Sequence, residues 1–111
     1  MLKNHPLPDH LTAITAAQLA YSFNVLGNPL RVRLCAALTH SPVTLAELSV
    51  QLNVALDVAL QHLNTLIQLG LITATLTRGL VIYRFRTRTA KNWFIQSLKL
   101  LTASITPDTS G

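Results

Sequence analysis

The chain has 111 residues, of which 50% are apolar and 12% are charged. This allows one domain and excludes a disordered chain, because burial of so much apolar surface offsets the entropy of ordering. Nine Lys and Arg against four Asp and Glu give a net charge of +5, which favours polyanionic partners such as nucleic acid. The few acidic residues form no paired carboxylates and no nucleophile–base set, so we expect neither an enzyme nor a cofactor.

The first nine residues are predicted to form an irregular arm, because Pro6 and Pro8 interrupt regular structure. The N-terminus lacks the basic start and strongly apolar centre of a secretory signal. No later stretch reaches the roughly 20 apolar residues of a membrane span. We therefore expect a cytoplasmic protein without a membrane partner, with a single domain over residues 10–105 and a flexible tail at 106–111.

Two helices are predicted in the first third of the chain. The first covers residues 10–26, with Asp9 as its N-cap and apolar side chains at helical spacing. Asn28 suits the N-cap and Pro29 the first position of the second helix, which covers residues 29–39.

Two further helices are predicted after a turn. Thr44 and Glu47 have the spacing of a capping box, which opens a third helix over residues 44–52. A fourth helix covers residues 54–69 and ends at Gly70. Two helices joined by so short a turn are typical of a helix-turn-helix, in which the second helix enters the major groove of DNA.

The pattern then changes from helical to strand-like. Residues 71–77 and 80–87 are predicted to pair as a β-hairpin around a turn at Arg78 and Gly79. A last helix is predicted over residues 89–105. The order α-α-α-α-β-β-α is that of a mainly α fold with a β-hairpin wing, a winged helix-turn-helix.

The predicted wing carries much of the basic charge of the chain. Arg84, Arg86 and Arg88 alternate along the strand and therefore project from one face, while Arg78 lies at the tip. These positions allow guanidinium groups to pair with phosphate oxygens. The alternative is that they only protect an edge strand from aggregation, but that role needs no single sign of charge, so we favour phosphate contact. The candidate DNA-contacting residues of the fourth helix and the wing are Leu56, Asp57, Val58, Gln61, Asn64, Arg78, Arg84, Arg86 and Arg88.

Three segments have a family-like pattern. Residues 26–34 are LGNPLRVRL, residues 62–72 are HLNTLIQLGLI and residues 78–85 are RGLVIYRF. In order and spacing they resemble the ArsR/SmtB repressors, whose patterns are L-x-(D/N)-P-x-R-x-x-(I/L), H-L-x-x-L-x-x-x-G-L-(V/I) and a wing with R-x-G and a following tyrosine.

This resemblance implies a homodimeric winged helix whose first and last helices pair across a two-fold axis. It also implies a transcriptional repressor that binds duplex DNA and is released by metal ions or other small signals. The candidate residues of the dimer seam are Leu11, Ile14, Tyr21, Trp93, Phe94, Leu98 and Leu101.

The usual metal sites of that family are missing from the sequence. Where many of its sensors have Cys-x-Cys in the third helix, residues 44–46 are Thr, Leu and Ala. Others use Asp, His and Glu in the last helix, and residues 89–105 contain none of these. We therefore predict no metal site, although zinc shared by the arm residues His5 and His10 of two chains stays open. Cys35, the single cysteine, is expected to be a buried thiol rather than a redox group.

The fourth helix departs from the family in a way that affects DNA recognition. Small polar residues are common at its start in the family, whereas this chain has Leu56 and Val58 on either side of Asp57. Apolar side chains can contact thymine methyl groups, and Gln61 and Asn64 can pair with adenine. An exposed apolar patch more often contacts protein. A second function therefore stays open, a protein-interaction module that has lost sequence-specific DNA recognition.

Overall fold

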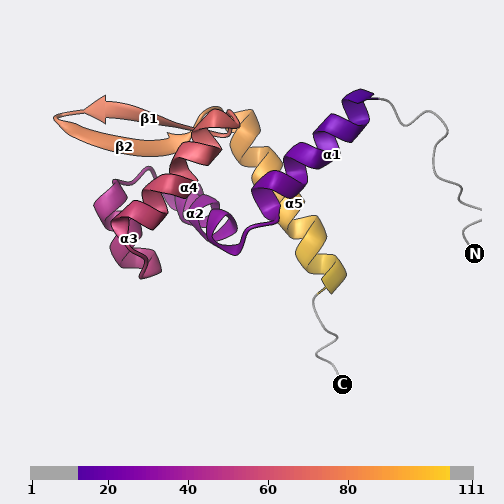
Figure 1. The fold of residues 1–111 in the computed structure, drawn as a ribbon, viewed down its shortest axis with the longest axis horizontal. Coiled ribbons are helices and arrows are strands. Elements are labelled where there is room, and N and C mark those ends of the chain that lie inside the picture. The colour runs from indigo at the N-terminus through magenta and orange to yellow at the C-terminus, as the bar shows by residue number, and fades with distance from the viewer. Residues whose placement is uncertain (1–12, 106–111) are drawn as a thin grey trace, which may run out of the picture.

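The computed structural model describes residues 13–105, and at residues 13–15 and 104–105 it describes the backbone alone. Its elements are α1 (Ala13–Leu26), α2 (Pro29–His40), α3 (Leu45–Leu52), α4 (Leu56–Gln68), β1 (Ile72–Thr77), β2 (Leu80–Phe85) and α5 (Arg88–Ile105) (Figure 1). The predicted order of four helices, a hairpin and a last helix is confirmed. The predicted arm at 1–9, the Asp9 cap and the tail at 106–111 lie outside the described residues.

Two helix starts have the caps that the sequence predicts. Asn28 Oδ1 accepts hydrogen bonds from the N–H groups of Leu30 and Arg31, at 2.9 and 3.1 Å. At α3, the Glu47 N–H donates to Thr44 Oγ1 at 3.2 Å, and the Thr44 N–H donates to the Glu47 carboxylate at 2.8 Å. These bonds satisfy N–H groups that have no carbonyl partner in the first turn of a helix.

The fourth helix begins two residues later than predicted. Asn53 adopts the left-handed conformation, with φ of 55°, and its N–H bonds back to carbonyl groups at the end of α3. Ala55 remains extended and provides no side-chain cap. Residues 53–55 therefore form the connection between α3 and α4, and α4 starts at Leu56.

The second strand is shorter than predicted, ending at Phe85 rather than at residue 87. The reason is Thr87, whose hydroxyl accepts a hydrogen bond from the Ala90 N–H at 3.0 Å and so caps α5. Arg88 consequently begins a helix. The prediction that Arg88 shares a strand face with the preceding arginines is wrong.

β1 and β2 form an antiparallel hairpin. The paired residues are Ile72 with Phe85, Thr73 with Arg84, Ala74 with Tyr83, Thr75 with Ile82, Leu76 with Val81 and Thr77 with Leu80. Arg78 and Gly79 have φ of 53° and 80°, as both central positions of a type I′ turn require. Val43 and Tyr83 exchange two backbone hydrogen bonds, at 3.1 and 2.8 Å, which attach the start of the helix-turn-helix to the base of the wing.

One hydrophobic core joins these elements. The largest fully buried side chains are Phe94, Leu34, Leu48, Leu63, Leu66, Leu71, Ile72, Val25 and Cys35. They come from all five helices, from β1 and from Leu71, which directly precedes β1. Because each helix contributes to the same core, the helix-turn-helix, the wing base and α5 are held in fixed relative positions.

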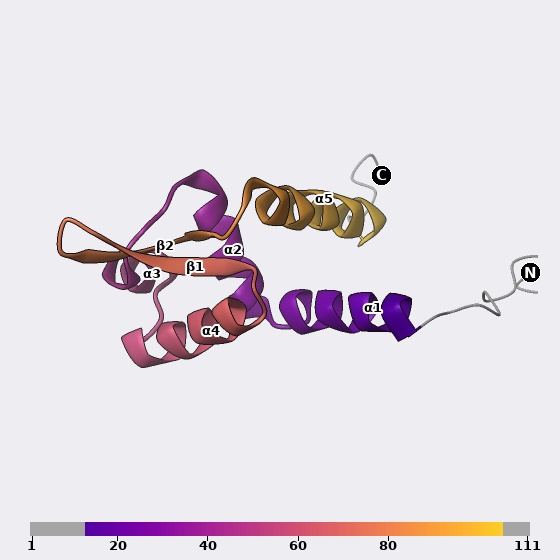
Figure 2. The same cartoon turned by 90° about the horizontal axis from the view of Figure 1, so that it is seen from above.

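The hairpin lies between α4 on one side and α5 on the other (Figure 2). Its tip extends to one end of the molecule, and α1 and the far end of α5 lie at the opposite end (Figures 1 and 2). The two regions predicted to contact DNA and to form a dimer seam are therefore at different ends of the chain's long dimension.

Candidate nucleic-acid interface

The fourth helix has one face in the core and one exposed face. Ala59, Leu63 and Leu66 are buried. The five residues that the sequence nominates for DNA contact are all exposed, namely Leu56, Asp57, Val58, Gln61 and Asn64. Leu56 is 53% exposed and Val58 is 39% exposed, so the apolar start of α4 is open to a partner.

The acidic residue at the start of α4 has a local role. One Asp57 carboxylate oxygen accepts a hydrogen bond from the Val58 N–H at 2.9 Å. A negative charge in the first turn also complements the positive end of the helix dipole. Asp57 thus stabilises the start of α4, while its exposed carboxylate repels any phosphate brought close to that end.

The wing presents its arginines to solvent. Arg78, at the turn, and Arg84 and Arg86 are exposed, whereas Tyr83 and Phe85 face the core from the other side of β2. Within residues 13–105, none of these three arginine side chains has a hydrogen bond or an ion pair. Their donors are therefore available to phosphate oxygens, which accept bidentate guanidinium bonds.

Two other arginines have structural partners, which sequence reasoning did not assign. Arg31 donates from Nη1 to the carbonyl and side-chain oxygens of Asn24, both at 2.7 Å, and from Nε to His62 Nδ1 at 3.3 Å. Arg33 donates to the Leu52 carbonyl at 2.9 Å. The arginine of the 26–34 segment and the histidine of the 62–72 segment thus connect α1, α2 and α4.

The described histidines and the cysteine make no metal centre. Among residues 13–105, no group of three or more His, Cys, Asp or Glu is placed to hold a metal ion. Cys35 is fully buried, and loss of water around the sulfur raises the thiol pKa to about 12. His5 and His10 lie outside the described residues. No helix in the described part of the chain is long and apolar enough to cross a membrane.

The nominated seam residues have different environments. Tyr21 and Trp93 meet edge to face, with ring centroids 5.4 Å apart, and so join α1 to α5 within one chain. Leu101 is 49% exposed.

Phe94 is fully buried inside the chain and contacts Phe85, with ring centroids 5.9 Å apart, so its assignment to the seam is wrong. Leu98 is half-buried against the core. Leu11 and the side chain of Ile14 lie outside the described residues.

Three further apolar residues of α1 and α5, not predicted from the sequence to lie in the seam, are exposed in the structure. Phe23 is 71% exposed, Leu100 70% and Leu19 47%. With Leu26 and Leu101 they line an apolar hollow of about 350 Å³ between α1 and α5. The signal was present as the i, i+4 spacing of Leu19 and Phe23, on a different face of α1 from Tyr21, which the sequence predicts to lie in the seam.

Comparison with known proteins agrees with this architecture. A sequence model of a family described as a helix-turn-helix domain matches residues 26–74. No curated protein matches the sequence.

Several solved structures are similar across most of the chain. HlyU from Vibrio cholerae N16961 has 20% identity and a TM-score of 0.69, covering 86% of this chain and 100% of that chain. The homodimeric winged helix-turn-helix DNA-binding domain of Mb0332 from Mycobacterium bovis, described as a possible ArsR-family transcriptional regulator, has 18% identity and a TM-score of 0.74, covering 90% and 92%. The transcriptional repressor BigR from Xylella fastidiosa has 18% identity and a TM-score of 0.71, covering 92% and 100%.

The fold and these similarities define the class: the chain is a winged helix-turn-helix protein. Within that class, the comparisons support the resemblance to ArsR/SmtB repressors that residues 26–86 carry.

Proposed function

We propose that this protein is a DNA-binding transcriptional regulator of the repressor type that acts on duplex DNA as a homodimer. The observation that carries the proposal is the pairing of an exposed α4 face with a wing whose exposed arginines have no carboxylate partner among the described residues. A helix-turn-helix with a cationic hairpin beside it matches both the major groove and the flanking phosphates.

In this proposal α4 enters the major groove. Gln61 and Asn64 are exposed one turn apart on α4 and have the amide groups that pair with adenine. Leu56 and Val58 contact thymine methyl groups. Arg78, Arg84 and Arg86 bind backbone phosphates, which fixes the position of the helix without specifying sequence.

The dimer seam is proposed at the other end of the chain. Exposed apolar side chains of α1 and α5, above all Phe23 and Leu100, need cover from water. A two-fold seam there leaves both α4 helices and both wings free for one duplex. We further propose that release from DNA does not use the cysteine and last-helix metal sites common in ArsR/SmtB sensors, because their ligands are missing from this sequence.

Titration against random duplex DNA at several salt concentrations tests the proposal. We expect binding at about 50 mM salt that falls steeply by about 200 mM, because phosphate contacts release counterions. Arg78→Asn removes one charge while tolerating the left-handed backbone, so it should weaken binding to all sequences and reduce the salt slope by about 1.

The matched control is Lys99→Gln, which removes an exposed charge from α5 instead of the wing. It should leave the affinity and the salt slope unchanged. Absence of duplex binding by the wild-type dimer at low salt would contradict DNA binding.

A second candidate function is a protein-interaction module. The observation that favours it is the exposed apolar start of α4, together with Val50 of α3, which is 82% exposed. Leu56→Ser combined with Val58→Thr separates the two functions. If the chain binds DNA, the double variant should retain or strengthen binding to the duplex. If neither the wild type nor the variant binds duplex DNA and the variant loses a protein complex that the wild type forms, the interaction module is supported.

A further inference from the structure

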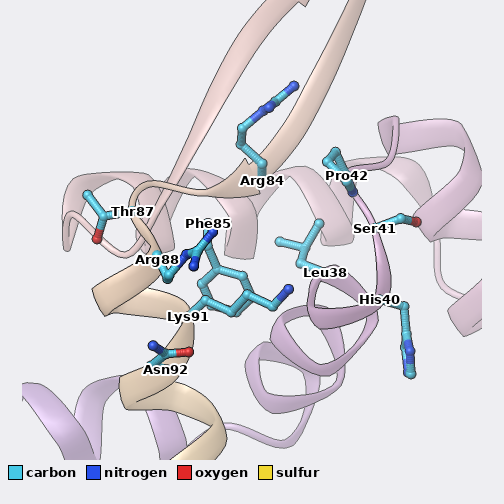
Figure 3. Close-up of a pocket in the computed structure, with 10 residues that line it drawn as sticks. All are labelled: Leu38, His40, Ser41, Pro42, Arg84, Phe85, Thr87, Arg88, Lys91 and Asn92. Atoms are coloured by element: carbon cyan, nitrogen blue, oxygen red, sulfur yellow. The ribbon is translucent and has the colours of Figure 1, made fainter.

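A pocket of about 530 Å³ lies where the end of α2, the following turn, the base of β2 and the first turns of α5 meet (Figure 3). Arg88 and Lys91 extend toward it from α5, whereas Arg84 on β2 and His40 at the end of α2 lie at its edge with their side chains turned away from the middle. None of the described residues that line it is an Asp or Glu. Its volume falls in the range of small-molecule sites.

The cations of this pocket have no partners within the described chain. Among residues 13–105, Arg84, Arg88 and Lys91 make no side-chain hydrogen bond and no ion pair, unlike Arg31 and Arg33, which are bonded. Arg88 and Lys91 are three residues apart on α5 and so share one face of the helix. Like charges held this close repel each other, and a bound anion would turn the repulsion into attraction.

The rest of the lining suits an oxyanion attached to a small organic group. Ser41, Thr87 and Asn92 add hydroxyl and amide groups beside the cations. Leu38 and Phe85, both nearly buried, give an apolar floor. Such a floor with convergent polar groups at its edge is the usual composition of a site for a compact ligand.

The pocket shares Arg84 with the wing surface proposed to bind DNA phosphates, but it is separate from the α4 face proposed to contact bases. No residue of α3 or α4 is among its described lining residues, and the hairpin stands between α4 and α5 (Figure 2). We propose that this pocket binds the phosphate group of a small phosphorylated molecule, with Arg88 and Lys91 as the phosphate ligands and Arg84 adding positive charge at its edge. The inference does not depend on DNA binding by the chain.

Such a ligand would contact the wing base and α5 at the same time. The site therefore lies between the wing and the helix proposed to form part of the dimer seam.

Calorimetric titration of the full chain with pyrophosphate, at constant ionic strength, tests the site. We expect saturable binding of one pyrophosphate per chain. Arg88→Gln combined with Lys91→Gln should weaken it at least about tenfold, because charge-assisted bonds to phosphate are lost. Lys99→Gln, which also removes a charge from α5, and Arg78→Asn at the wing tip should leave it unchanged. Circular dichroism checks that each variant is folded, and Arg88→Gln alone provides a milder second variant.

Three results would overturn the proposal. The first is no saturation by about 10 mM pyrophosphate. The second is equal weakening by Lys99→Gln, which would mean binding to general surface charge. The third is no pyrophosphate binding together with duplex affinity and salt slope reduced by the double variant, which would assign these cations to DNA backbone phosphates.

Discussion

At the scale of single residues, Cys35 shows how burial decides chemistry. Its side chain is fully buried in α2, and desolvation raises the thiol pKa to about 12. The thiolate is the reactive form of cysteine. At pH 8 we therefore expect the native thiol to react with a small disulfide reagent at least about a hundredfold more slowly than the urea-unfolded chain.

Stopped-flow absorbance with and without urea makes this comparison. The reaction of the same disulfide reagent with free cysteine gives the reference rate. Equal rates for native and unfolded chains would contradict the buried position of Cys35.

At the scale of elements, the capping box of α3 links helix stability to pH. Hydrogen bonds from the Thr44 backbone N–H and hydroxyl lower the pKa of Glu47 from its usual value. A carboxyl group whose pKa is lower in the folded state contributes stability above its unfolded pKa and loses it as the pH falls through the folded pKa. Glu47→Ala should therefore destabilise the protein at pH 7, and the difference from wild type should shrink below about pH 4.

Urea unfolding midpoints at pH 7 and pH 3 measure this difference. Gln51→Ala changes an exposed, uncharged residue of the same helix and should show a difference that does not depend on pH. A Glu47→Ala effect that is the same at both pH values would contradict a capping role of the ionised carboxylate.

At the scale of the whole molecule, the exposed apolar residues of α1 and α5 argue for self-association. Phe23 is 71% exposed at the edge of the hollow between these helices. If a second chain covers it, Phe23→Asp places an unpaired charge in the seam. We expect the dimer dissociation constant to rise at least about a hundredfold.

Size-exclusion chromatography followed by light scattering, at micromolar protein concentration, measures the mass of each variant. Val50→Asp makes the same change at a residue that is 82% exposed on α3, far from the proposed seam, and should leave the dimer intact. A wild-type chain that elutes as a monomer would contradict the seam.

Local interactions made much of the fold predictable from the sequence. The Asn28 cap joins residues two and three apart, and the Thr44–Glu47 box joins residues three apart. The hairpin turn depends on two adjacent positions with positive φ. Errors arose where local signals compete: strand alternation favoured a longer β2, but the Thr87 cap starts α5 and places Arg88 on a helix.

The candidate site was predictable only in part. Exposure of the α4 residues and of the wing arginines followed from periodicity, because a helix or strand with one face in the core must turn the other outward. Phe94 could not be assigned in this way, since its stripe on α5 has apolar residues that face both the core and solvent. Which of them contacts Phe85 depends on how α5 crosses the hairpin.

The sequence by itself therefore determined the order of elements, the caps of α2 and α3, the charge of the wing and the missing metal ligands, because these depend on residues close together in the chain. The tertiary structure alone decided the bond between Arg31 and His62, 31 residues apart, and which residues of α2, β2 and α5 line one pocket, among them His40, Arg84, Arg88 and Lys91. Such groupings are set by the packing of α2, β2 and α5 on one core, which no local pattern specifies.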